Sequence, residues 1–178
     1  FRIDKRGGGS FRLFRQGRET NMEAGEKWQL SVIPADFTVP DFAPGTVMYQ
    51  IFPDRFARSG SCDLTYKLQP FWVHESPDEL PEYRPDAHGE VRNNDFFGGN
   101  FAGIREKLPY LQELGVGVLY LNPIFMAWSN HRYDTADYRR PDPMLGTEED
   151  FRTLCDEAHA RGMRVILDGV FSHTGSNS

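Results

Sequence analysis

The sequence is poor in cysteine, lacks a long apolar run and has no excess of basic residues. Cys62 and Cys155 are too few for a disulfide framework and too far apart for a zinc or redox motif. The best apolar run, Val116 to Leu121, is far shorter than the roughly 18 residues of a membrane-spanning helix, which argues against a membrane protein. The 20 basic and 26 acidic residues give a net charge of −6, which argues against a nucleic-acid groove.

The composition of the chain changes along its length of 178 residues. Trp28, Leu30 and Val32 alternate with polar residues, which predicts a half-buried strand, and Gly7 to Gly9 predict a hairpin turn or flexible loop. We therefore expect residues 1–35 to be the tail of a β-sandwich domain. Residues 36–45 are expected to form a proline-rich linker, and residues 46–178 a second domain. Because the chain starts at a phenylalanine, we expect it to belong to a longer protein.

Residues 46–178 alternate between short apolar runs and amphipathic segments. The apolar runs 47–52, 116–121 and 163–167 predict strands, of which the first is expected to be buried on both faces. Apolar residues spaced three and four apart predict one helix between Asn100 and Gly115. A capping-box pattern at Thr147 predicts a second helix that ends at Gly162. The order strand–helix–strand–helix–strand favours parallel strands with right-handed crossovers, an α/β arrangement.

Such an array belongs either to an open doubly wound sheet or to the first part of a TIM (β/α)8 barrel. No G-x-G-x-x-G pattern follows any predicted strand, so a nucleotide-binding sheet loses its best support. Polar residues follow the strands at Asp54, Asn122 and Asp168, the edge at which barrel enzymes place their active sites. Two long excursions, residues 53–100 and 123–146, leave from the same edge, and loops of that length are usually functional.

Two stretches carry residues suited to chemistry. Residues 131–138 combine a histidine, two tyrosines and two aspartates, which suits a polyhydroxylated ligand, because aromatic faces stack on sugar C–H surfaces while polar groups bond hydroxyls. The alternative is a solvated loop whose polar side chains serve its own turns. Asp168 begins a run that leads to His173, and a carboxylate at the end of a buried strand needs a partner. A purely structural aspartate is the alternative there.

The second domain resembles the α-amylase family, glycoside hydrolase family 13, in its branch of neopullulanases, cyclomaltodextrinases and maltogenic amylases. The resemblance rests on four stretches in barrel order, namely Met48 to Phe56, Asn122 to Phe125, His131 to Tyr138 and Asp168 to His173. The third is similar to the family's H-x-Y-D-T-x-D-Y signature and the last to its D-x-x-x-N-H motif. The first 35 residues resemble, more loosely, the end of the carbohydrate-binding module that precedes the barrel in this branch.

The resemblance implies retaining hydrolysis of α-1,4-glucosidic bonds in starch, maltodextrin or cyclomaltodextrin, with transglycosylation left open. Tyr133 would stack on the sugar at the cleavage point, His173 would bond its hydroxyls, and Asp168 would orient an arginine from the fourth strand. The catalytic carboxylates of the family follow strands four, five and seven, so we expect none in this chain and no glycosidase activity from these 178 residues alone. The implied partner is an α-glucan or maltooligosaccharide, without nucleic acid or membrane; a homodimer is left open.

We expect no cofactor and no metal, although members of the family bind calcium. Ser172 stands where the family's motif has asparagine, and Arg58 and Asn100 stand in segments where some members bind calcium through carboxylates and amides. Asp63 alone is a poor site for a cation that prefers 6–8 oxygens. Gly60 adds no side-chain oxygen.

Two other functions compete with a glucan hydrolase. A non-catalytic glucan-binding relative would keep the pocket and lose the carboxylates, and an Arg-x-Asp pattern on the fourth strand would argue against it. A metal-dependent barrel hydrolase would use His131, His173 and Asp168 as ligands. That class usually opens with His-x-His on the first strand, where this chain has Tyr49 to Ile51.

Overall fold

The computed structural model describes residues 1–15, 19–20 and 27–176. The chain divides into two compact units, Phe1–Val39 and Pro40–Ser178, each of which is described by itself. Among the described residues, no helix is long and apolar enough to cross a membrane.

The first unit is a small antiparallel sheet. Its strands are β1 (Arg2–Asp4), β2 (Ser10–Leu13) and β3 (Glu19–Thr20), in the order β1-β2-β3. Gly7 to Gly9 all have positive φ and turn the chain between β1 and β2, which confirms the predicted hairpin turn. The strand predicted over Trp28 to Val32 is wrong. Those residues pair with no strand in the described part of the chain and Val32 is 88% exposed, so its alternating pattern has neither a ladder nor a face to bury.

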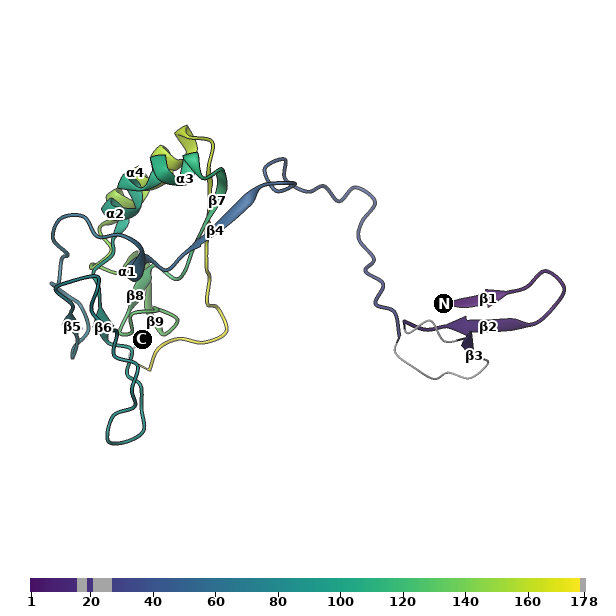
Figure 1. Cartoon of the computed structure of the whole chain (residues 1–178), viewed down its shortest axis with the longest axis horizontal. Coiled ribbons are helices and arrows are strands. Elements are labelled where there is room, and N and C mark those ends of the chain that lie inside the picture. The colour runs from purple at the N-terminus through teal and green to yellow at the C-terminus, as the bar shows by residue number, and fades with distance from the viewer. Residues whose placement is uncertain (16–18, 21–26, 177–178) are drawn as a thin grey trace. The chain divides into compact units, whose positions relative to one another are not determined.

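The second unit is built on a parallel sheet of three strands (Figure 1). They are β4 (Val47–Ile51), β7 (Val116–Leu121) and β10 (Arg164–Leu167), in the order β10-β7-β4. The predicted parallel arrangement is thereby confirmed. β4 is not buried on both faces as predicted, because Val47 and Met48 are 52% and 54% exposed. In the described chain the helices cover only one side of the sheet, and Ile51 is the only fully buried residue of β4.

Three helices pack beside one another on one side of this sheet (Figure 1). They are α2 (Phe101–Glu106), α3 (Leu108–Glu113) and α4 (Glu148–Ala160). Asn100 caps α2 by accepting a hydrogen bond from the Gly103 amide, and Thr147 caps α4 through a complete capping box with Asp150, both as predicted. The single helix predicted between Asn100 and Gly115 is interrupted at Lys107. Pro109 has no amide proton to donate to the carbonyl four residues earlier, so the helix is broken in two.

The two long excursions carry structure of their own. The first contains α1 (Pro53–Phe56), β5 (Trp72–Val73) and β6 (Asp95–Phe96), and the second contains β8 (Phe125–Ala127) and β9 (Thr135–Pro141). β5 and β6 pair in parallel, whereas β8 and β9 form an antiparallel ribbon. Gly99 and Gly103 lie so close to the backbone of residues 53–57 that any side chain there would overlap it. These glycines let α2 pack directly against α1.

Candidate glucan-binding site

The polar residues after the three strands gather at the carboxyl edge of the sheet. The amide of Asn122 donates to the carbonyl of Ile51, and the amide of Asp168 donates to that of Leu121, each at 2.9 Å. These bonds continue the ladder one residue beyond the strands. The Gln50 side chain donates to Asn122 Oδ1 at 2.8 Å, so neighbouring strand ends are also joined through side chains. In a parallel β/α sheet this edge is where binding sites form.

Tyr133 and Asp168 meet at this edge. The Tyr133 hydroxyl donates to Asp168 Oδ2 at 2.6 Å, across 35 residues of sequence. This bond and partial burial together raise the pKa of Tyr133 to about 12, because ionisation would place two negative charges side by side. Burial and the same carboxylate raise the pKa of Tyr120. The carboxylate predicted to need a partner therefore has one, and both members remain partly exposed to a ligand.

A tight turn before Tyr133 fixes the orientation of its ring. Ser129 bonds Asp134 through both its amide and its hydroxyl. His131 Nδ1 accepts a hydrogen bond from the Tyr133 amide at 3.1 Å and lies 3.0 Å from the Ser129 hydroxyl. Burial lowers the pKa of His131, so the neutral ring with its proton on Nε2 is favoured. The turn therefore offers a neutral donor next to an aromatic ring, whose centroid is 5.8 Å away.

Arg132, which lies between His131 and Tyr133, is fully buried and belongs to an ion cluster. Its Nε donates to Asp142 at 3.0 Å and its Nη1 donates to the Asn130 carbonyl at 2.8 Å. Lys67, from the first excursion, donates to the same Asp142 carboxylate at 2.6 Å. The two cations outweigh burial and lower the pKa of Asp142. The turn that carries Tyr133 is thus held in place by the buried ion cluster. The residue pattern within the turn does not predict this cluster.

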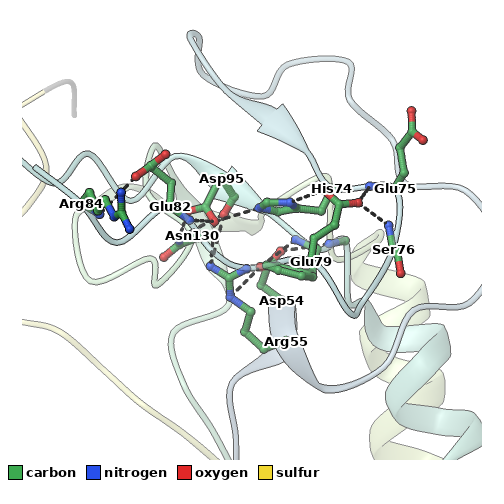
Figure 2. Close-up of polar contacts among 12 residues, drawn as sticks. Asp54, Arg55, His74, Glu75, Ser76, Glu79, Glu82, Arg84, Asp95 and Asn130 are labelled. Atoms are coloured by element: carbon green, nitrogen blue, oxygen red, sulfur yellow. Dashed lines mark hydrogen bonds and ion pairs between the residues drawn. The ribbon is translucent and has the colours of Figure 1, made fainter. Parts of the chain in front are cut away.

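A second polar network joins the first excursion to the same turn (Figure 2). Asp95 is its centre, and it accepts hydrogen bonds from His74 Nε2, the Glu82 amide and the Asn130 side chain, each at 3.0 Å. His74 Nδ1 lies 2.9 Å from Glu79. Burial acts to lower the pKa of His74, but its two carboxylate partners outweigh burial and raise it. The charged ring then donates from both nitrogens.

His173 occupies a different position from the other two predicted residues. It is exposed on the segment after β10, with Nδ1 3.0 Å from the Ser172 hydroxyl. The amide of Gly175 donates to the Thr135 carbonyl at 2.9 Å, which ties this segment to β9. Among the described contacts, Tyr133 is joined to Asp168 but not to His173. The structure therefore assembles two of the three residues and leaves the third near the same ribbon.

The side chains of residues 57–100 do not suit a calcium ion. Asn100 Oδ1 already accepts from the amides of Ser59 and Gly103, while its Nδ2 donates to the Ser59 carbonyl at 2.7 Å. Asp63 accepts from the Thr65 amide. Nowhere in the described residues do three or more His, Cys, Asp or Glu side chains gather in a way that suits a metal ion. Hydrogen bonds within the protein thus occupy the Asn100 side chain, whose oxygen a cation at this place would need.

Parallel strands flanked by helices, with polar residues gathered at the carboxyl edge of the sheet, are the arrangement found in β/α barrel domains. Residues 50–178 match the model of the α-amylase catalytic domain, and the chain belongs to that family. Relatives named maltogenic amylase, neopullulanase and cyclomaltodextrinase confirm the branch indicated by the sequence motifs.

Individual relatives match over most of this chain. An amylopullulanase of Thermoanaerobacter thermohydrosulfuricus is 44% identical over 91% of this chain and 12% of its own length. The intracellular maltogenic amylase of Bacillus subtilis (strain 168) is 49% identical over 80% of this chain and 22% of its own. The structure of the type III pullulan hydrolase from Thermococcus kodakarensis is 34% identical, with a TM-score of 0.65, over 99% of this chain and 30% of its own. The chain thus spans only about a tenth to a fifth of these curated relatives.

Proposed function

We propose that the protein carrying this chain is an α-glucan-active glycoside hydrolase that cleaves α-1,4-glucosidic bonds with retention. The observation that carries the proposal is the 2.6 Å bond between the Tyr133 hydroxyl and Asp168 at the carboxyl edge of the sheet. It pairs a partly exposed aromatic ring with a carboxylate, the combination that holds a sugar by its C–H face and its hydroxyls. The names of the relatives, amylases and pullulan hydrolases, support an α-glucan substrate such as starch, maltodextrin or cyclomaltodextrin.

This chain supplies substrate binding in the proposed reaction. Tyr133 is the stacking ring, Asp168 fixes the Tyr133 hydroxyl and is placed to orient a cation from the next strand, and His173 bonds sugar hydroxyls. Retaining hydrolysis needs a nucleophile and an acid/base about 5–5.5 Å apart. By resemblance to the family, these follow later strands of the barrel, so we expect residues 1–178 alone to be inactive. Transglycosylation would use the same covalent intermediate with a sugar hydroxyl as acceptor.

The anomeric form of the first product tests the proposal. The full-length protein is mixed with maltodextrin and proton NMR spectra are recorded before mutarotation is complete, with a heat-inactivated sample as control. We expect the α-anomer to appear first. An initial β-anomer would refute retention. Binding of glucan without hydrolysis would instead support a non-catalytic glucan-binding relative.

A further inference from the structure

We propose that a pocket beside Trp72 is a second α-glucan site, distinct from the one at Tyr133. The pocket has a volume of about 270 Å³ and is lined mainly by Trp72, Glu82, Arg84, Asp86, Arg92 and Asn94. All of these residues come from the first excursion. The proposal rests on the proposed function, because it assigns to the pocket the same class of ligand.

The backbone of Trp72 is held in a short strand ladder. Trp72 lies in β5, opposite Asp95 of β6, and its amide donates to the Asn94 carbonyl at 3.2 Å. The side chain is nevertheless 44% exposed. An exposed indole that lines a pocket and is carried on a strand offers a stacking surface to a ligand.

The polar wall of the pocket is also ordered before any ligand arrives. Asp86 accepts hydrogen bonds from the amides of His88 and Glu90, and Arg92 Nε donates to its other oxygen at 3.0 Å. The hydrogen bonds from the amides of Glu90 and His88 lower the pKa of Asp86 and keep it charged. Asn94 Oδ1 is buried and has no hydrogen-bond partner within the described part of the chain. The wall therefore combines fixed donors with a spare acceptor.

The charges around the pocket favour a neutral ligand. Three carboxylates, those of Glu82, Asp86 and Glu90, face two guanidinium groups, those of Arg84 and Arg92. The lining therefore has one negative charge in excess and gives a phosphate no positive field, while the Asp86–Arg92 ion pair compensates one of the three carboxylates. Guanidinium donors, carboxylate acceptors and an aromatic face together suit a hydroxyl-rich, uncharged sugar.

Hydrogen bonds connect this pocket to the turn that carries Tyr133. The amide of Asn130 donates to the Asn93 carbonyl at 2.6 Å, and its side chain donates to Asp95. Glu82, at the pocket, donates its amide to the same Asp95, and Figure 2 shows Glu82 and Arg84 on the side of Asp95 away from Glu79. These bonds connect the two sites through Asn130 and Asp95. We therefore expect them to hold different parts of a single long glucan.

Comparing long and short substrates tests the second site. In the full-length protein, the ratio of kcat/KM for soluble starch to kcat/KM for maltotriose is measured for the wild type, Trp72→Ala and Trp72→Phe. We expect this ratio to fall about tenfold in Trp72→Ala and less in Trp72→Phe, which keeps a stacking ring. Native gels containing amylopectin should show weaker retardation of Trp72→Ala in parallel.

Tyr110→Ala is the matched control, because Tyr110 is an aromatic residue of α3 that is 54% exposed and far from the pocket lining. Its ratio and gel retardation should equal those of the wild type. An unchanged ratio and unchanged retardation in folded Trp72→Ala would overturn the proposal. If Trp72→Ala does not fold, Arg84→Gln is used in its place. The ratio of kcat/KM values should again fall, and an unchanged ratio and retardation would again overturn the proposal. A wild type that hydrolyses neither substrate refutes the proposed function, while amylopectin retardation still tests Trp72.

Discussion

The residue with the most unusual environment is Lys67, whose ammonium group is buried beside Arg132 and shares the single carboxylate of Asp142 with it. Burial outweighs the attraction of Asp142 and lowers the pKa of Lys67 to about 8. An unfolded lysine titrates near 10.4, so between these two values the unfolded chain holds more protons than the folded one. The free energy of unfolding therefore rises with pH across this interval.

Replacement of Lys67 by methionine should remove this pH dependence. We expect the free energy of unfolding of the wild type, relative to that of Lys67→Met, to rise by about 3 kcal/mol between pH 7 and pH 10.5. Urea unfolding of the full-length protein at a series of pH values measures this difference. Lys107→Met, at an exposed position between α2 and α3, serves as control and should give a curve parallel to that of the wild type. Parallel curves for wild type and Lys67→Met would contradict the prediction.

Tyr133 offers a direct test of the proposed binding site. Tyr133→Ala removes both the ring and its bond to Asp168, and we expect kcat/KM for maltotriose to fall about 5- to 150-fold, equivalent to about 1–3 kcal/mol. Tyr133→Phe keeps the ring and should lose less. Steady-state kinetics on the full-length variants, with circular dichroism to verify folding, measure both effects. Unchanged kinetics in a folded Tyr133→Ala protein would mean that the ring only packs its turn.

At the scale of elements, the sequence predicts those features that depend on residues close together in the chain. Asn100 and Thr147 cap their helices as expected, because a cap depends on residues only three positions apart. The helix break at Pro109 was missed since apolar spacing continues across it. The ribbon of β8 and β9 was also missed, as was the Lys67–Asp142 pair, which lies 75 residues apart in sequence. Neither leaves a periodic trace. Motif resemblance predicted Tyr133 and Asp168, which the structure joins by a hydrogen bond, but it did not predict the ion cluster that holds the turn before Tyr133.

Because α1 and α2 are in close contact, we expect a glycine-to-alanine change in α2 to destabilise the protein, whereas helix propensity alone would predict stabilisation. In an ordinary helix, Gly→Ala stabilises by up to about 1 kcal/mol. A side chain at Gly103 would overlap the Ala57 carbonyl, which is backbone and cannot rotate away. We expect Gly103→Ala to destabilise by about 1–3 kcal/mol, measured by urea unfolding. A more stable variant would show that α2 does not pack against α1 as described.

For residues 46–178 as a whole, we predict no tightly bound calcium and therefore no contribution of calcium in this region to stability. Asn100 Oδ1 and Asp63 Oδ1 accept hydrogen bonds from amides of the protein, and Arg58 places a cation near Gly98. The change in Tm between EDTA and millimolar calcium should agree within about 1 °C for the full-length protein and its Asn100→Ala variant, because a tight site at Asn100 would add several kcal/mol at saturation. Calorimetry measures this. A rise of several degrees in calcium that Asn100→Ala abolishes would contradict the prediction.

The shared carboxylate of Asp142 also sets an order of events during synthesis. The carboxylate that pairs with Lys67 belongs to Asp142, which the ribosome adds 75 residues later. The first excursion therefore cannot reach its final packing when it leaves the ribosome. Closing so long a loop is slow compared with forming α4 or the hairpin at Gly7 to Gly9. The elements that precede Asp142, such as α2 and α3, can therefore form before the two excursions are joined through Lys67 and Asp142. Nascent chains arrested before Asp142 should expose the first excursion to proteases, whereas those arrested well beyond it should not.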